Sequence, residues 1–180
     1  MHIVISASPN ENGLTAACAR AAQEGIREAS GEAEFIDLCA MKIASCMMCG
    51  NGWGKCREGH ACVIDDGLAE LQRKIGEAQG LFLVTPVYWG QPSERMKSFL
   101  DRFRRCEALK GEDSALAGKK VNLVAAAGGS GNGTLTCLSE MEIWCRHVRA
   151  IPHQRIGITR FNRDSMLAAI EQVAVEMVTG

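Results

Sequence analysis

Short apolar runs alternate with longer stretches of helical periodicity along the whole chain, and this alternation constrains the fold more than any single motif. Leu81–Val84 carries no polar side chain, which is typical of a strand buried on both faces of a sheet. Strands separated by helices pair in parallel through right-handed crossovers, with helices on both faces. The pattern therefore predicts a three-layer α/β sandwich around a five-stranded parallel sheet. The predicted strands are His2–Ser6, Ala33–Asp37, Leu81–Val84, Val121–Ala126 and Arg155–Thr159.

Apolar residues at helical spacing fill most of the chain between and after these strands. No repeat, low-complexity segment or linker interrupts the 180 residues, so a single domain over residues 1–180 is predicted. Residues 39–62 show no period and contain several glycines, which predicts a long cysteine-rich loop. The predicted helices are Gly13–Ala29, one after a cap at Asp65-Asp66, one beginning at Pro92, Thr134–Arg149 and Ser165–Val178.

The formal net charge is −1 and no basic run occurs, so the sequence does not favour nucleic acid or an anionic membrane as a partner. The apolar N-terminal run is too short to span a membrane and lacks the basic start of a signal peptide. We therefore expect a cytoplasmic protein, in which structural disulfides are uncommon. Five scattered cysteines are interpreted as small buried hydrophobic residues: Cys18, Cys39, Cys106, Cys137 and Cys145.

Three unusual loops follow strands of the predicted sheet: Ser8–Thr15, Thr85–Gln91 and Gly128–Gly133. In open parallel sheets, ligands bind beyond the carboxyl ends of the strands, near the switch point in strand order. Because these ends share one edge of the sheet, we expect the three loops to meet there and to form a binding site.

The first of these loops has the composition of an anion-binding site. It ends at a helix N-terminus, where free backbone N–H groups and the helix dipole favour negative charge. Ser8 and Thr15 add hydroxyl groups, and Asn10 and Asn12 add amides. The loop contains no lysine or arginine and matches neither a Walker loop nor a G-x-G-x-x-G fingerprint, which argues against ATP and against a dinucleotide fold. An ordinary strand-to-helix loop with a polar cap is the alternative.

A second segment, after the third predicted strand, carries a more specific motif than the first loop. The run Pro86-Val87-Tyr88, followed by Met96-Lys97 and Asp101-Arg102, closely resembles the corresponding segment of NAD(P)H-dependent FMN reductases and iron–sulfur flavoproteins. Ser8–Thr15 resembles the phosphate loop of that family, and Cys62–Asp66 resembles the stretch after its cysteine loop. The likeness extends from Met1 to about His147.

The resemblance implies a flavodoxin-like fold with strand order 2-1-3-4-5 and a bound FMN. It also implies NAD(P)H as co-substrate and a homodimer or homotetramer. The alternative to ring contact for Tyr88 and Trp89 is packing on a strand end. The alternative for the glycine loop is a plain turn. Asn10 departs from the arginine or lysine of many relatives. The implied FMN ligands are Ser8, Asn10, Asn12, Gly13, Leu14 and Thr15 for the phosphate, and Pro86, Val87, Tyr88, Trp89, Gly90, Gly128, Gly129, Ser130 and Gly131 for the ring.

Four cysteines, Cys46, Cys49, Cys56 and Cys62, fall within seventeen residues in the pattern C-x2-C-x6-C-x5-C. Four thiolates suit either a [4Fe–4S] cluster or tetrahedral zinc. The resembling flavoproteins place a compact cluster motif in this loop, but here Gly52 stands where a cysteine is expected. A cluster, a zinc ion and thiols without metal all remain open at this point.

The predicted function is an FMN-dependent oxidoreductase. The flavin carries out the chemistry, and no protein side chain is expected to act as a catalytic acid or base. One form is a reductase that uses NAD(P)H to reduce FMN or a quinone-type acceptor. The other is an iron–sulfur flavoprotein that receives electrons from a ferredoxin-like donor. In both forms a small molecule is the final electron acceptor. The alternatives are a non-enzymatic FMN-binding electron carrier or redox sensor, and a zinc-stabilised interaction domain. Asp101-Arg102 are expected to be helix-surface charges.

Overall fold

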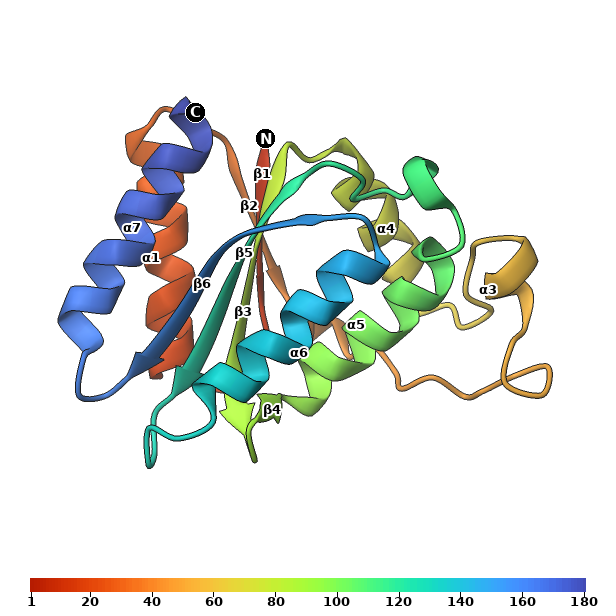
Figure 1. Ribbon diagram of the computed structural model, residues 1–180, viewed down its shortest axis with the longest axis horizontal. Coiled ribbons are helices and arrows are strands. Elements are labelled where there is room, and N and C mark those ends of the chain that lie inside the picture. The colour runs from red at the N-terminus through yellow and green to blue at the C-terminus, as the bar shows by residue number, and fades with distance from the viewer.

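The computed structural model describes all 180 residues as a parallel sheet between two layers of helices, which confirms the predicted sandwich (Figure 1). The sheet order is β2-β1-β3-β5-β6, and every one of these neighbouring pairs is parallel. With the two-residue β4 set aside, this is the predicted 2-1-3-4-5 order. The strands are β1 (His2–Ser6), β2 (Ala33–Asp37), β3 (Gly80–Tyr88), β4 (Gln91–Pro92), β5 (Lys120–Ala127) and β6 (Ile151–Thr159).

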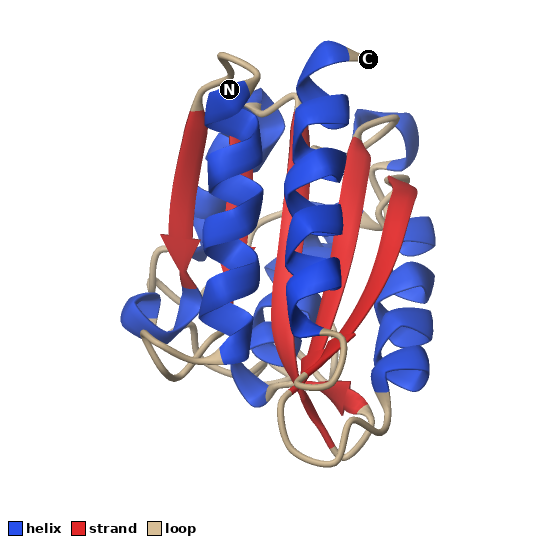
Figure 2. Cartoon of the chain, turned by 90° about the vertical axis from the view of Figure 1, so that its left-hand side faces the viewer, coloured by secondary structure: helices blue, strands red, loops and turns tan.

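The helices α1 and α7 cover one face of the sheet, and α4, α5 and α6 lie on the other (Figures 1 and 2). The short helices α2 and α3 lie in the segment 39–62 that was expected to be a loop: α2 overlaps its start, and α3 contains Cys56. No helix has both the length and the hydrophobicity needed to cross a membrane. The helices are α1 (Leu14–Glu28), α2 (Leu38–Met41), α3 (Lys55–Glu58), α4 (Leu68–Glu77), α5 (Glu94–Glu107), α6 (Thr134–His147) and α7 (Arg163–Thr179), with a 3-10 turn at Gly111–Asp113.

The strands alternate their side chains between two separate hydrophobic cores, as the period of two in a strand requires. On β3, Leu81 and Leu83 enter the core under α4, α5 and α6, whereas Phe82 and Val84 enter the core under α1 and α7. All four are fully buried. Burial on both faces explains why this run contains no polar residue.

A further local difference from the sequence prediction lies after the third strand. The segment expected to be a loop after the third strand continues as β3 and turns back through the two-residue β4, with Val87 opposite Pro92. The two turn residues, Trp89 and Gly90, have positive φ angles of 54° and 80°. Two successive positive φ angles match the twist of a two-residue hairpin, and Gly90 adopts such an angle without steric cost.

The packing of α1 against α7 depends on a close approach at Gly25. A β-carbon placed on Gly25 would lie 2.2 Å from the backbone oxygen of Glu171 and 2.8 Å from the β-carbon of Ala174. Real atoms do not approach so closely, so a larger residue there must separate the two helices. Gly76, near the end of α4, has only ordinary contact with its nearest neighbour, Ala115, at 3.8 Å.

These two helical glycines predict opposite effects of the same substitution. Gly25→Ala should lower the free energy of unfolding by about 1–3 kcal/mol, because overpacking outweighs the gain in helix propensity. Gly76→Ala should raise it by about 0.5 kcal/mol, since only the propensity changes. Urea denaturation measures both, and a stabilised Gly25→Ala protein would contradict the close packing of α1 and α7.

Candidate functional site

The carboxyl ends of β1, β3 and β5 lie at one edge of the sheet, at the bottom of Figure 1. Ser6 pairs with Val84, Val84 pairs with Val124, and Pro86 pairs with Ala126. The loops that follow these strands therefore begin side by side. The second and third loops also touch, because a β-carbon on Gly133 would lie 2.7 Å from the α-carbon of Gly90. The three loops thus lie at one edge of the sheet, as expected, and the second and third are in contact.

The first loop presents an uncapped helix N-terminus. Gly13 occupies the N-cap position of α1 and offers no side-chain hydrogen bond. The first backbone N–H groups of a helix have no acceptor within it, so those of α1 are available to an anion. Thr15 is buried in this first turn. The Ser8 hydroxyl instead donates to the backbone oxygen of Asn10 at 2.8 Å, which shapes the loop.

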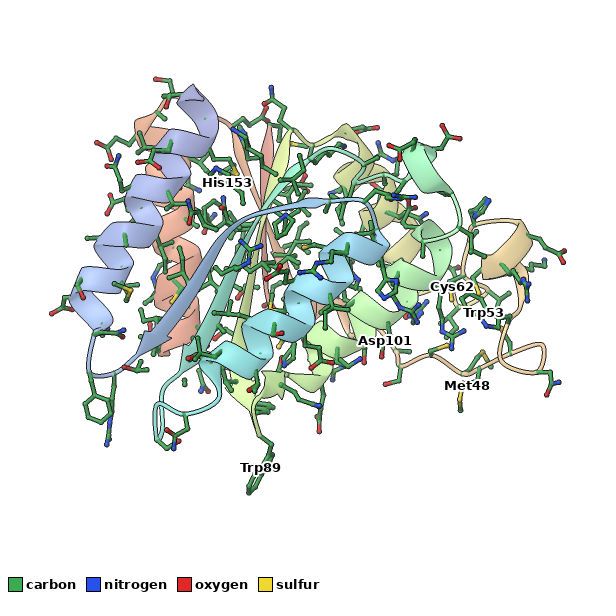
Figure 3. All side chains as sticks on the ribbon, viewed as in Figure 1. Met48, Trp53, Cys62, Trp89, Asp101 and His153 are labelled. Carbon is green, nitrogen blue, oxygen red and sulfur yellow. The ribbon has the colours of Figure 1, made fainter.

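The segment Pro86–Gly90 changes from buried to exposed within a few residues. Pro86 is buried at the end of β3, and Tyr88 is exposed. Trp89 is 103 % exposed and projects from the hairpin tip (Figure 3). Trp89 therefore does not pack on the strand end. Tyr88 and Trp89 line one surface hollow with Lys97, whereas Ser8 and Asn10 line a different one.

The glycine loop is open on the side away from the protein. Gly128 and Gly129 are exposed, and a β-carbon on either would meet no atom within 4 Å. The loop leads into α6, whose N-cap Gly133 also makes no side-chain cap. Two uncapped helix N-termini and an accessible backbone at one edge suit a ligand with a phosphate and a flat ring, so this edge fits an FMN.

A residue that sequence reasoning did not select, Arg20, contributes to the hollow of Ser8 and Asn10. Arg20 lies on α1 and donates to the backbone oxygen of Glu11 at 2.8 Å. Asp37, the last residue of β2, and Cys39, in the following α2, line the same hollow. Cys39 is therefore only half-buried, which corrects the expectation of a buried hydrophobic residue. The order of the strands explains this neighbourhood, because β2 pairs with β1 and ends beside the first loop.

The cysteine-rich loop brings its four predicted ligands together. Cys46, Cys49, Cys56 and Cys62 line one cavity. Cys62 is labelled on the right in Figure 3. Cys106 from α5 also lines this cavity, and burial, with the nearby Cys62 and Cys56, raises the pKa of its thiol to about 12. No three metal-ligating side chains are arranged around a single ion. The thiols thus surround a common space without converging on one point.

Arg102 corrects the expectation of a helix-surface charge, because its side chain is only 1 % exposed. Its guanidinium forms a two-pronged ion pair with Asp66. It also donates to the backbone oxygens of Ala44 at 3.1 Å and Ile64 at 3.3 Å, and to the sulfur of Cys62 at 3.1 Å. Arg102 lies three residues after Phe99 and four before Cys106, and both of these residues are buried. Residues at this spacing share one face of a helix, so the sequence carried a signal that Arg102 points inward.

Asp66 likewise has a different role from the one expected. Gly67 is the N-cap residue of α4, without a side-chain cap, and the Asp66 carboxylate accepts from Arg102 and from the Ala44 amide at 2.8 Å. Burial alone would raise the pKa of Asp66, but these hydrogen bonds lower it below its ordinary value of 3.8. Burial alone would lower the pKa of Arg102, but Asp66 and Cys62 raise it.

A second arginine on α5 holds the middle of the cysteine loop. Arg105 donates to the backbone oxygen of Gly52 at 2.6 Å, and its guanidinium lies 4.7 Å from the ring centre of Trp53. Arg102 and Arg105 both line the thiol cavity. The loop contains little regular structure, so its shape depends on these contacts with the helix.

The doubly wound sheet and its three converging loops define a flavodoxin-like domain. Residues 2–160 match the family of NADPH-dependent FMN reductases, and the chain belongs to that family. It is 37% identical over 102 residues to an iron–sulfur flavoprotein of Methanocaldococcus jannaschii, covering 57% of this chain and 51% of the relative. The chain spans between half and two thirds of the curated relatives it matches most strongly.

Solved structures support the fold. A flavone reductase superposes with a TM-score of 0.77 at 16% identity, covering 99% of this chain and 62% of the other. An archaeal flavodoxin superposes with a TM-score of 0.62 at 16% identity, covering 99% and 96%. At such identities the likeness shows the flavodoxin-like fold, while the family match supports FMN as the cofactor.

The buried ion pair predicts a pH-dependent loss of stability in Asp66→Asn. At pH 7 the substitution should lower the free energy of unfolding by about 3 kcal/mol, because it leaves the Arg102 charge without its partner. The pKa of Asp66 is depressed, so the stabilisation is complete above the ordinary carboxyl pKa and is lost as pH falls through the depressed value. The difference between variant and wild type should therefore shrink in acid.

Asp101→Asn is the matched control, because Asp101 pairs with Lys97 at 2.8 Å on an exposed helix surface. Surface pairs of this kind contribute at most about 0.5 kcal/mol. Chemical denaturation at several pH values measures both variants. Equal losses for Asp66→Asn and Asp101→Asn would contradict a structural role for the buried pair.

Proposed function

We propose that the protein is an FMN-dependent oxidoreductase of the iron–sulfur flavoprotein type. The observation that carries this proposal is the cavity lined by four loop cysteines in a chain that belongs to the FMN reductase family. Curated relatives named iron–sulfur flavoproteins support it. A single zinc ion receives less support, since the thiols surround a space without converging on one point. Unligated thiols are the alternative that the metal analysis below tests.

The phosphate of FMN is assigned to the N-terminus of α1. The free N–H groups of Leu14 and Thr15 would bind it, and the Thr15 hydroxyl would add a donor, with the exposed Asn12 preceding them in the same loop. The ring is assigned to the space between the β3–β4 hairpin, with Tyr88 and Trp89, and the glycine loop of residues 128–131. When bound, the flavin supplies the transfer of hydride and single electrons.

The cluster is assigned to Cys46, Cys49, Cys56 and Cys62. Four-cysteine ligation is the usual mode for [4Fe–4S] clusters, which supply one-electron transfer. These residues would hold the centre near the surface of the domain, within reach of a ferredoxin-like donor, and a small molecule would be the final electron acceptor. If the protein held no cluster, NAD(P)H would reduce its flavin directly.

We further propose that the protein forms a cytoplasmic homodimer or homotetramer. Trp89, Leu135 and Phe161, from three segments near the carboxyl edge of the sheet, are largely exposed. Large apolar side chains gathered at one edge favour contact with another copy. Such a contact would also shield the flavin ring assigned to this edge.

Phosphate recognition by α1 predicts a selective effect of Thr15→Val. The variant should bind FMN roughly tenfold more weakly, because one hydrogen bond to a charged phosphate is lost. Its affinity for riboflavin, which has no phosphate, should not change. Fluorescence titration measures both, and Thr179→Val at the end of α7 is the control. Equal weakening for FMN and riboflavin would contradict the assignment.

The cysteine cavity predicts the metal content of the protein. Anaerobically purified or reconstituted protein should contain about four iron and four sulfide per chain. Cys62→Ala should lose most of both, whereas Cys137→Ala, a buried cysteine of α6, should keep them. Iron and sulfide analysis together with the visible spectrum measures this. FMN without iron, with NAD(P)H turnover, would establish the cluster-free reductase; FMN without turnover would establish a carrier or sensor.

A further inference from the structure

Arg102 joins the two ends of the cysteine loop to α5. Its guanidinium contacts Ala44, before the first cysteine, and Cys62, Ile64 and Asp66 at the far end. Asp66 also accepts from the Ala44 amide, so both ends of the loop converge on one buried charge. The contacts of Arg102 with the two backbone oxygens and the Asp66 carboxylate would be enough to anchor the loop. The contact with the sulfur of Cys62 is additional to it.

The same guanidinium has an unused donor. The Nε of Arg102 is buried and has no hydrogen-bond partner, one of three such side-chain atoms in the protein. A buried donor without an acceptor is destabilising, and more so when the group is charged. Arg102 lines the thiol cavity, and its Nη2 already donates to one of the cavity's sulfur atoms. An acceptor within this cavity would remove the cost.

We propose that Arg102 is a positioning residue for the iron–sulfur centre: it holds the Cys62 thiolate through Nη2 and offers Nε to a second sulfur atom of the centre. This inference rests on the proposed function and adds to it the residue that sets the reduction potential. Hydrogen bonds to the sulfur atoms of a cluster stabilise its more negative, reduced state, so they raise the potential.

Arg105 provides an internal comparison. It lies one turn further along α5, lines the same cavity and carries the same charge, but its guanidinium contacts the oxygen of Gly52 and the ring of Trp53. Lysine in place of either arginine keeps the charge and removes the planar array of donors. A loss specific to Arg102 therefore reports the directional contact with sulfur, and a loss common to both reports the charge or the shape of the loop.

The test compares Arg102→Lys and Arg105→Lys in the reconstituted full chain. Iron and sulfide are measured first, and the midpoint potential follows from a redox titration monitored by electron paramagnetic resonance. Arg102→Lys should keep the cluster and lower the equilibrium constant for its reduction at least tenfold, a shift of about 59 mV for one electron. Arg105→Lys should change this constant less than threefold. Equal shifts, or no shift in Arg102→Lys, would overturn the proposal.

A measurement on the wild-type protein covers the case in which Arg102→Lys does not fold. In protein labelled with ¹⁵N-arginine, pulsed electron paramagnetic resonance of the reduced cluster should detect a coupled arginine nitrogen, which should persist in Arg105→Lys. Absence of this coupling in cluster-loaded protein overturns the role of Arg102 and leaves the proposed function standing. Absence of iron and sulfide from wild type overturns the proposed function, and this inference with it.

Discussion

The burial of a parallel sheet on both faces is the constraint on which the rest of this protein depends. Two helical layers cover the sheet, so its broad surfaces are used for packing and the side chains of β3 are divided between two cores. The edge formed by the carboxyl ends of the strands is left open for the proposed flavin, while the cysteine cavity lies away from the sheet, between its loop and α5. The parallel register places Ser6, Val84 and Val124 side by side, which is why loops distant in sequence begin together.

The sequence predicted the elements whose pattern is periodic and local. Runs such as Leu81–Val84 are readily recognised because a strand buried on both faces has no polar position, and the flavodoxin-like order followed from the resemblance. The β3–β4 hairpin was missed because its β4 arm contains only Gln91 and Pro92, which is too short to show any period. The meeting of the loops was predicted from topology, but their placement in two separate hollows depends on side-chain positions.

The contacts of the cysteine loop were less accessible to sequence reasoning. The spacing of the cysteines suggested a common centre, and the shared cavity is consistent with that prediction. Arg102 and Asp66 were interpreted as ordinary surface and capping residues, because charged residues are rarely buried unless they are paired. Their pairing joins positions 36 residues apart, which no local pattern indicates. Cys106 was correctly expected to be buried, yet its place beside the loop thiols depends on how α3 and the loop pack on α5.

Helix α5 connects the two proposed redox sites within one rigid element. Its first turn is tied to the flavin edge, because the Ser93 hydroxyl caps α5 and the Ser93 amide donates to the Thr85 hydroxyl at 3.1 Å. Arg102, eight residues after the helix begins, lies about 12 Å further along its axis. Loops that held a flavin and a cluster independently would allow the separation between them to vary. Here the hairpin is fixed to one end of a helix and the cysteine loop to the other, so the fold itself sets the separation between the two proposed sites.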